Sequence, residues 1–208
     1  PVGRAHRGCF SNTRPETLLR QSIRAAVAQA PGLDPQAIED VICGCALPEA
    51  QQGLNVARIT ALLAGLPAST GGMTVNRFCA SGLAAVAMAA DRIRVGEAEV
   101  LVAAGVESMS LLPMMGHHPS LHPDIFNGDN DIGLAYGMGL TAEKVAQQWQ
   151  VSREAQDAFA LESHRRAVAA QQAGAFADEI TSVTIEARQL DLGSGTVRSI
   201  ERTIDRDE

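Results

Sequence analysis

The chain has 208 residues, of which 46% are hydrophobic and 20% charged, and its formal net charge is -7. This balance provides enough apolar side chains for a sizeable core and excludes disorder over the whole chain. The negative charge argues against nucleic-acid binding through a broad basic surface. No apolar run reaches the ~18 residues that a membrane span needs, and no secretory signal is visible, so we expect a cytoplasmic protein without a membrane span.

The first half of the chain alternates predicted helices with predicted strands. Apolar residues on one face predict helices over 17–30, 55–63 and 80–95, each ended by Gly or Pro. Short apolar runs predict strands over 41–45 and 100–104, and a further short strand is predicted over 74–77, after Gly71 and Gly72. Strands that alternate with crossover helices indicate an α/β fold, with a mostly parallel sheet and helices on both faces.

The pattern changes after residue 105. Residues 111–140 are rich in Pro, Gly, Met and His and show no periodicity, which is typical of a functional loop. Helices are predicted over 141–150 and 152–173, and a strand over 180–185. From Gly193 the sequence is polar, and we expect no contribution to the core after Ile204.

Cys79 is the strongest candidate for a catalytic residue. It follows the predicted strand 74–77 and directly precedes a predicted helix. Unpaired amides and the positive end of the helix dipole stabilise a thiolate there, and the same amides can hold a developing oxyanion. The position resembles a nucleophile elbow with Cys in place of Ser. A free cysteine can also be a small buried hydrophobe, and the spacing alone leaves both readings open.

The other candidates favour structural roles. Cys43 and Cys45 are expected to face opposite sides of the sheet as packing residues, because they alternate along one predicted strand. His117, His118 and His122 form a cluster that could bind zinc, but no Cys or carboxylate stands at ligand spacing, so we expect a solvated loop and no metal site. The methionines of this region serve either core packing or a flexible apolar tunnel for an acyl chain.

Three sequence blocks resemble the thiolase family. Residues 75–86 (VNRFCASGLAAV) look like the acyl-enzyme cysteine motif, 104–110 (AGVESMS) like the second signature, and 136–143 (YGMGLTAE) like the pantetheine-side loop. They occur in the family's order and spacing, together with 53–58 (GLNVAR). The resemblance therefore identifies Cys79 as the nucleophile and suggests Gly137 and Met138 as substrate-binding residues.

The resemblance also implies a reaction. In thiolases the cysteine attacks the 3-oxo carbonyl of a 3-oxoacyl-CoA, acetyl-CoA leaves, and a second CoA releases the shortened acyl group. Covalent catalysis divides the carbon–carbon cleavage into two acyl transfers. The expected partners are coenzyme A thioesters and a second copy in a homodimer, and no metal or organic cofactor is expected.

Family thiolases are about twice as long and consist of two similar halves. The resemblance implies thiolase-like αβα layers over 1–110, without the family's first strand, and an incomplete, inserted α-rich loop domain over 111–208. The second half, with its catalytic His and second Cys, is absent, so we expect no turnover from this chain alone.

Two features favour a degradative 3-oxoacyl-CoA thiolase of fatty-acid β-oxidation. Gly137 stands where thiolases that make acetoacetyl-CoA usually carry His, and the preceding segment 127–133 is short. A biosynthetic acetoacetyl-CoA thiolase and a non-catalytic, thiolase-like protein that binds acyl-CoA or lipid are the alternatives.

Overall fold

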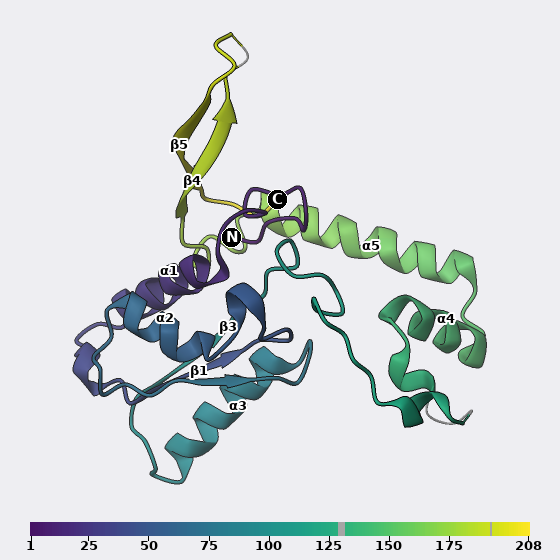
Figure 1. Cartoon of the computed structure of the whole chain (residues 1–208), viewed down its shortest axis with the longest axis horizontal. Coiled ribbons are helices and arrows are strands. Elements are labelled where there is room, and N and C mark those ends of the chain that lie inside the picture. Colours follow the sequence, from purple (N-terminus) through teal and green to yellow (C-terminus); the bar gives the residue numbers. More distant parts are fainter. Residues whose placement is uncertain (129–131, 192) are drawn as a thin grey trace. The chain divides into compact units, whose positions relative to one another are not determined.

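A computed structural model describes residues 1–128, 132–191 and 193–208 (Figure 1). The chain forms two compact units, which are described separately. One comprises Pro1–His117 with Ile180–Glu208, and the other comprises His118–Glu179. The predicted division into domains 1–110 and 111–208 stays a prediction.

The first unit contains a three-stranded parallel sheet. Its strands are β1 (Asp40–Gly44), β2 (Met73–Val75) and β3 (Leu101–Gly105), in the order β2-β1-β3. Cys43 in the central strand is aligned with Thr74 on one side and with Ala104 on the other. This sheet confirms the predicted α/β class with parallel strands.

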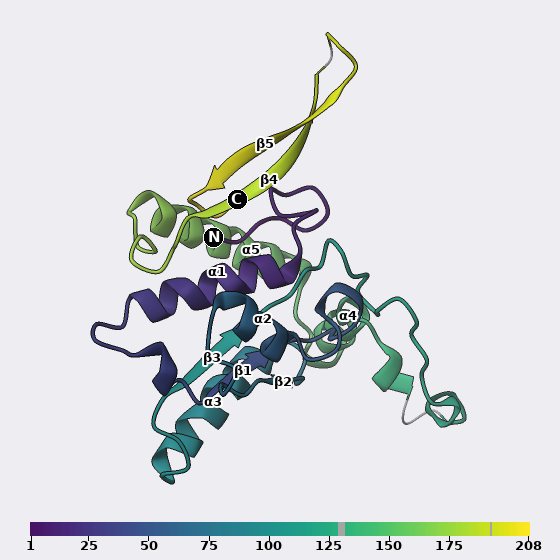
Figure 2. The same ribbon diagram turned by 60° about the vertical axis from the view of Figure 1, so that its left-hand side comes forward.

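Helices cover both faces of the sheet, as the alternation of side chains along β1 requires. On one face, α1 (Pro15–Ala28) and α2 (Val56–Ala64) contribute to an apolar core with Val41 and Cys43. On the other face, α3 (Ser81–Arg94) packs Ala85 and Ala89 against Ile42. Figure 2 shows the sheet between these helices. The predicted αβα layers are therefore confirmed.

The helix ends follow the sequence signals. The Asn55 side chain accepts a hydrogen bond from the amide of Arg58 at 3.2 Å and caps α2. The same helix ends at Gly65, whose φ of 91° is in the left-handed region that glycine tolerates. Short 3-10 helices, η1 (Pro35–Ala37) and η2 (Ala50–Gln52), lie in the connections.

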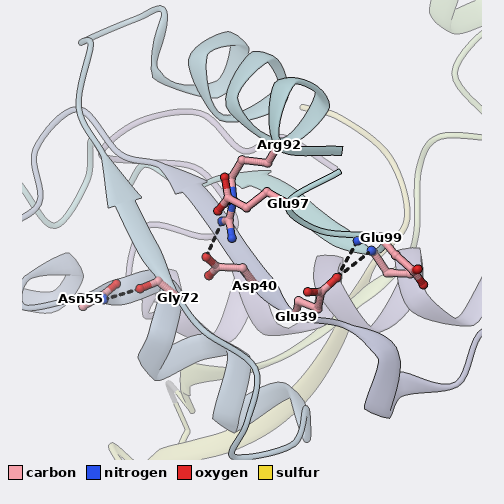
Figure 3. A network of polar contacts seen from close by, with 8 residues as sticks. Glu39, Asp40, Asn55, Gly72, Arg92, Glu97 and Glu99 are labelled. Atoms are coloured by element: carbon pink, nitrogen blue, oxygen red, sulfur yellow. Dashed lines mark hydrogen bonds and ion pairs between the residues drawn. The ribbon is translucent and has the colours of Figure 1, made fainter. Parts of the chain in front are cut away.

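Ionic and polar contacts fasten the amino-terminal ends of β1 and β3 (Figure 3). Arg92 of α3 binds Asp40 at 2.7 Å and Glu97 at 2.8 Å. The Glu39 carboxylate accepts hydrogen bonds from the amides of Glu99 (2.6 Å) and Val100 (3.4 Å). These contacts stabilise the end of the sheet at which β1 and β3 begin. Cys79 lies at the opposite end, where the strands end.

An antiparallel hairpin completes the first unit. It consists of β4 (Val183–Leu190) and β5 (Val197–Ile204) (Figure 1). Val183, Ile185 and Ile204 form a small core with Phe10 of the N-terminal segment. The sequence predicted only a strand over 180–185 and missed β5. Its side chains are exposed except at Ile204, so it lacks an apolar face and depends on pairing with β4.

The regular elements among the described residues of the second unit are all helices. It contains the 3-10 helices η3 (Pro123–Phe126) and η4 (Ile132–Ala135), then α4 (Met138–Trp149) and α5 (Arg153–Gln172). The two long helices agree with the predicted ones at 141–150 and 152–173. Among the residues that the structure describes, no helix has the length and apolar character needed to cross a membrane.

Candidate active site

Cys79 lies in a tight turn between β2 and α3. The side chain is exposed, and α3 begins two residues later at Ser81. Its amide donates to no other residue that the structure describes. An unpaired amide close to a helix start is suited to donate a hydrogen bond to a developing oxyanion. The exposed position contradicts the alternative reading of Cys79 as a buried hydrophobe.

The backbone before Cys79 is left-handed. Phe78 has a φ of 46°, which is unusual for a bulky residue, and the residue is 71% exposed. The Asn76 carboxamide oxygen accepts the Phe78 amide at 2.9 Å. The Ser81 hydroxyl accepts the amide of Arg77 at 2.8 Å and donates to the Phe78 carbonyl at 2.5 Å. Side chains on both sides of Cys79 therefore hold this turn.

Gly44 allows α3 to approach the end of β1. A β-carbon on Gly44 would stand 2.6 Å from the amide nitrogen of Gly82, which is closer than real contacts allow. The absence of a side chain at Gly44 therefore sets how closely the helix start can approach the sheet. A β-carbon on Gly82 would meet no atom within 4 Å, so the space beside this first turn is open.

A polar network around the buried side chain of Gln52 holds the loop that follows β3. The Glu107 carboxylate accepts the amide of Ala46 at 2.6 Å and also binds the side-chain amide of Gln52. The fully buried Gln52 in turn accepts the amide of Ser108 at 3.0 Å. The loops after β1 and β3 are thus joined at the carboxyl end of the sheet, where ligands of α/β proteins bind.

Cys43 and Cys45 are packing residues, as predicted, but they do not face opposite sides of the sheet. Both belong to the core beneath α1 and α2. That expectation was wrong because side chains two residues apart along a strand point to the same face. Burial raises the pKa of Cys43 to about 12 and that of Cys45 to about 11, so both remain neutral thiols near pH 7.

Cys9 is partly buried in the N-terminal segment. Burial, followed by the nearby Glu208 carboxylate, raises the pKa of its thiol. Of the four cysteines, Cys79 is the only exposed one.

The histidine cluster shows no metal centre. No group of three or more potential metal-binding side chains gathers anywhere in the described parts of the chain. The His122 imidazole instead accepts the amide of Asp124 at 3.2 Å and caps η3.

Gly137 and Met138 begin α4 in the second unit, Gly137 as the N-cap and Met138 as an exposed first residue. Cys79 belongs to the first unit, and the substrate-binding role of Gly137 and Met138 stays a prediction. Residues 129–131 of the short segment before them lie outside the described residues. Met109, Met114, Met115 and Met138 are at least 44% exposed, so none serves as a core residue.

Sequence reasoning did not single out Asn76, Ser81, Gln52 or Gly44. The contact of Asn76 could have been predicted from its position two residues before Phe78. An Asn side chain often accepts a hydrogen bond from the backbone amide two residues further along the chain. The Gln52 network had no such local signal, since its partner Glu107 is distant in sequence.

Comparisons of the chain with a family model and with curated proteins agree on one family. The model of the family "Thiolase, N-terminal domain" matches residues 1–206. A 3-ketoacyl-CoA thiolase of Bacillus subtilis (strain 168) is 43% identical over 190 residues, which cover 91% of this chain and 48% of that protein. A 3-ketoacyl-CoA thiolase of Shewanella sp. (strain MR-7) is 44% identical over 184 residues, covering 88% of this chain and 46% of that protein. The chain thus spans about half the length of these curated relatives.

Proposed function

Because the chain belongs to the thiolase family and represents its N-terminal region, we propose that the full-length protein is a 3-oxoacyl-CoA thiolase of the fatty-acid β-oxidation type. The single observation that carries the proposal is the position of Cys79, exposed beside the start of α3. A thiolate there can reach an approaching thioester substrate, whereas buried Cys43 and Cys45 cannot.

The proposed chemistry begins at the Cys79 sulfur. The thiolate attacks the 3-oxo carbon, and the bond between C2 and C3 breaks. Its electron pair remains on C2 of the departing acetyl-CoA enolate, which takes up a proton. The thiolate of a second CoA then attacks the Cys79 thioester and expels the Cys79 thiolate. We propose that the Cys79 amide contributes to the oxyanion site.

We also propose roles for the residues that bind the substrate and for those that transfer protons. Gly137 and Met138 contact the CoA thioester, and the general base and second cysteine come from the other half of the full-length protein. The reaction needs no metal or organic cofactor, because the thioester itself stabilises the enolate. We further expect the protein to act in the cytoplasm.

A homodimer is also proposed. β2 is an outer strand of its sheet in the described structure, so one of its edges is available. Pairing with the same edge of a second copy would satisfy backbone donors and acceptors there. Light scattering of the full-length protein at micromolar concentration is expected to give the mass of a dimer, and a strict monomer would refute the assembly.

Thiolysis assays of the full-length protein test the function. We expect CoA-dependent cleavage of 3-oxoacyl-CoA substrates of several chain lengths, and its loss in Cys79→Ala. Activity confined to acetoacetyl-CoA would favour the biosynthetic alternative. Acyl-CoA binding without cleavage would favour the non-catalytic one. The 208-residue chain alone is expected to show no steady-state thiolysis.

A further inference from the structure

The left-handed backbone conformation of Phe78 is not explained by packing of its side chain. Phe78 is 71% exposed, yet its backbone adopts a φ of 46° that bulky residues avoid. Such a conformation persists only where the surrounding structure determines it. Phe78 directly precedes Cys79. Its backbone conformation therefore sets the direction in which the Cys79 side chain projects from the backbone.

Asn76 and Ser81 supply the contacts that hold this turn. Asn76 binds the amide of Phe78 at 2.9 Å, and Ser81 binds its carbonyl at 2.5 Å. The amide of Phe78 is therefore satisfied by a side chain, and its carbonyl by the Ser81 hydroxyl together with the Ser81 amide at 3.0 Å. Ser81 is only 4% exposed, so water cannot readily replace its hydroxyl in this role.

Asn76 also fastens the turn to the sheet. Its side-chain nitrogen donates to the carbonyl of Ala46 at 3.0 Å, in the loop after β1. The amide of Ala46 is in turn bound by Glu107 at 2.6 Å. One carboxamide thus links the turn before Cys79 to a loop that is itself held at the carboxyl end of the sheet.

We propose that Asn76 and Ser81 are positioning residues for the Cys79 nucleophile. They hold Phe78 in its left-handed conformation and thereby aim the Cys79 thiol and amide at the substrate carbonyl. This inference rests on the proposed function of Cys79. It assigns to neither residue any contact with the substrate.

The test compares variants of the full-length protein. Asn76→Ala and Ser81→Ala are expected to lower kcat for thiolysis by about 10- to 100-fold, because small misplacements of reacting groups carry costs of that size. KM is expected to stay within about twofold, since substrate binding groups are unchanged. Asn76→Ser should recover part of kcat, because a serine hydroxyl can also accept the amide two residues on.

Alkylation of Cys79 by iodoacetamide provides a second readout that needs no turnover. In Asn76→Ala the rate of Cys79 alkylation at a fixed pH should change, since a relaxed turn alters the direction and surroundings of the thiol. Asn76→Ser should return the rate toward that of the unchanged protein. Where Asn76→Ala fails to fold, Asn76→Ser and Ser81→Ala carry the same measurements.

Asn55→Ala is the matched control. Asn55 also uses both ends of its carboxamide, accepting the amide of Arg58 at 3.2 Å and donating to the carbonyl of Gly72 at 2.7 Å. Its carboxamide oxygen also accepts the Thr74 hydroxyl at 2.9 Å. None of these hydrogen bonds involves Phe78, so loss of Asn55 should lower stability but leave kcat and the rate of Cys79 alkylation unchanged.

The inference would be overturned if Asn76→Ala and Ser81→Ala fold but keep the kcat and the Cys79 alkylation of the unchanged protein. It would also be overturned if Asn55→Ala lost as much kcat as these two variants. Retained turnover in Cys79→Ala would instead refute the proposed function. The two failures are therefore distinguishable.

Discussion

Gly44 at the end of β1 lies directly against the backbone of Ser81 at the start of α3. A β-carbon at Gly44 would stand 2.6 Å from the amide of the next residue, Gly82. This close approach brings the carboxyl end of the central strand to the helix start that carries the candidate nucleophile.

Gly44→Ala is therefore expected to displace α3 or prevent its docking. Overpacking of this kind typically costs about 1–3 kcal/mol, and we expect a loss of that order in urea unfolding, with slower alkylation of Cys79. Gly82→Ala is the control, because its β-carbon would meet no atom within 4 Å. Equal stability of the two variants would contradict the assigned contact.

The four thiols should differ in their reaction with iodoacetamide. Cys79 is exposed, whereas Cys43 and Cys45 are buried and have pKa values raised to about 12 and about 11. Peptide mapping at neutral pH should find Cys79 labelled first, and Cys43 and Cys45 labelled only after unfolding. Labelling of Cys43 before Cys79 in the folded protein would contradict the structure.

The raised pKa of Cys43 also predicts a loss of stability in alkali. The ordinary thiol pKa is 9.0, and the folded value is about 12. Above pH 9 the unfolded chain loses this proton while the folded chain retains it, so the free energy of unfolding should fall as pH rises between these values. In Cys43→Ala the free energy of unfolding should fall less steeply with rising pH than in the unchanged protein. We expect this difference in slope even though the alanine side chain is smaller. Parallel pH profiles would argue against a buried neutral thiol.

Ser152 is expected to stabilise the start of α5. Its hydroxyl accepts the amide of Ala155 at 3.2 Å. Loss of such a cap costs about 1 kcal/mol, so Ser152→Ala should speed hydrogen exchange in the first turn of α5 about fivefold. Ser194→Ala, in the hairpin of the other unit, is the control. Unchanged exchange in Ser152→Ala would show that the cap contributes nothing.

The sequence predicted those elements whose signals are local. Glycines at 65 and 96 ended helices where expected, and the apolar run around Val41 formed the central strand. The strand β5 could not be predicted from its own residues, because its pairing with β4 rather than an apolar face makes it a strand.

The position of Cys79 between a strand and a helix could be predicted from the sequence, and the family motif made it the candidate nucleophile. The left-handed backbone of Phe78 could not, since the residue type disfavours that conformation. Its support by Asn76 and Ser81 becomes visible only when the turn is folded. The link between Gln52 and Glu107 likewise arises from sheet topology that brings distant loops together.

We propose above all that Cys79 carries the acyl group. Incubation of the full-length protein with a 3-oxoacyl-CoA in the absence of free CoA, followed by acid quenching and peptide mass spectrometry, tests it most directly. We expect a thioester adduct on the peptide that contains Cys79, its discharge on addition of CoA, and no adduct in Cys79→Ala. Turnover with an adduct on another residue, or turnover that survives Cys79→Ala, would contradict the account.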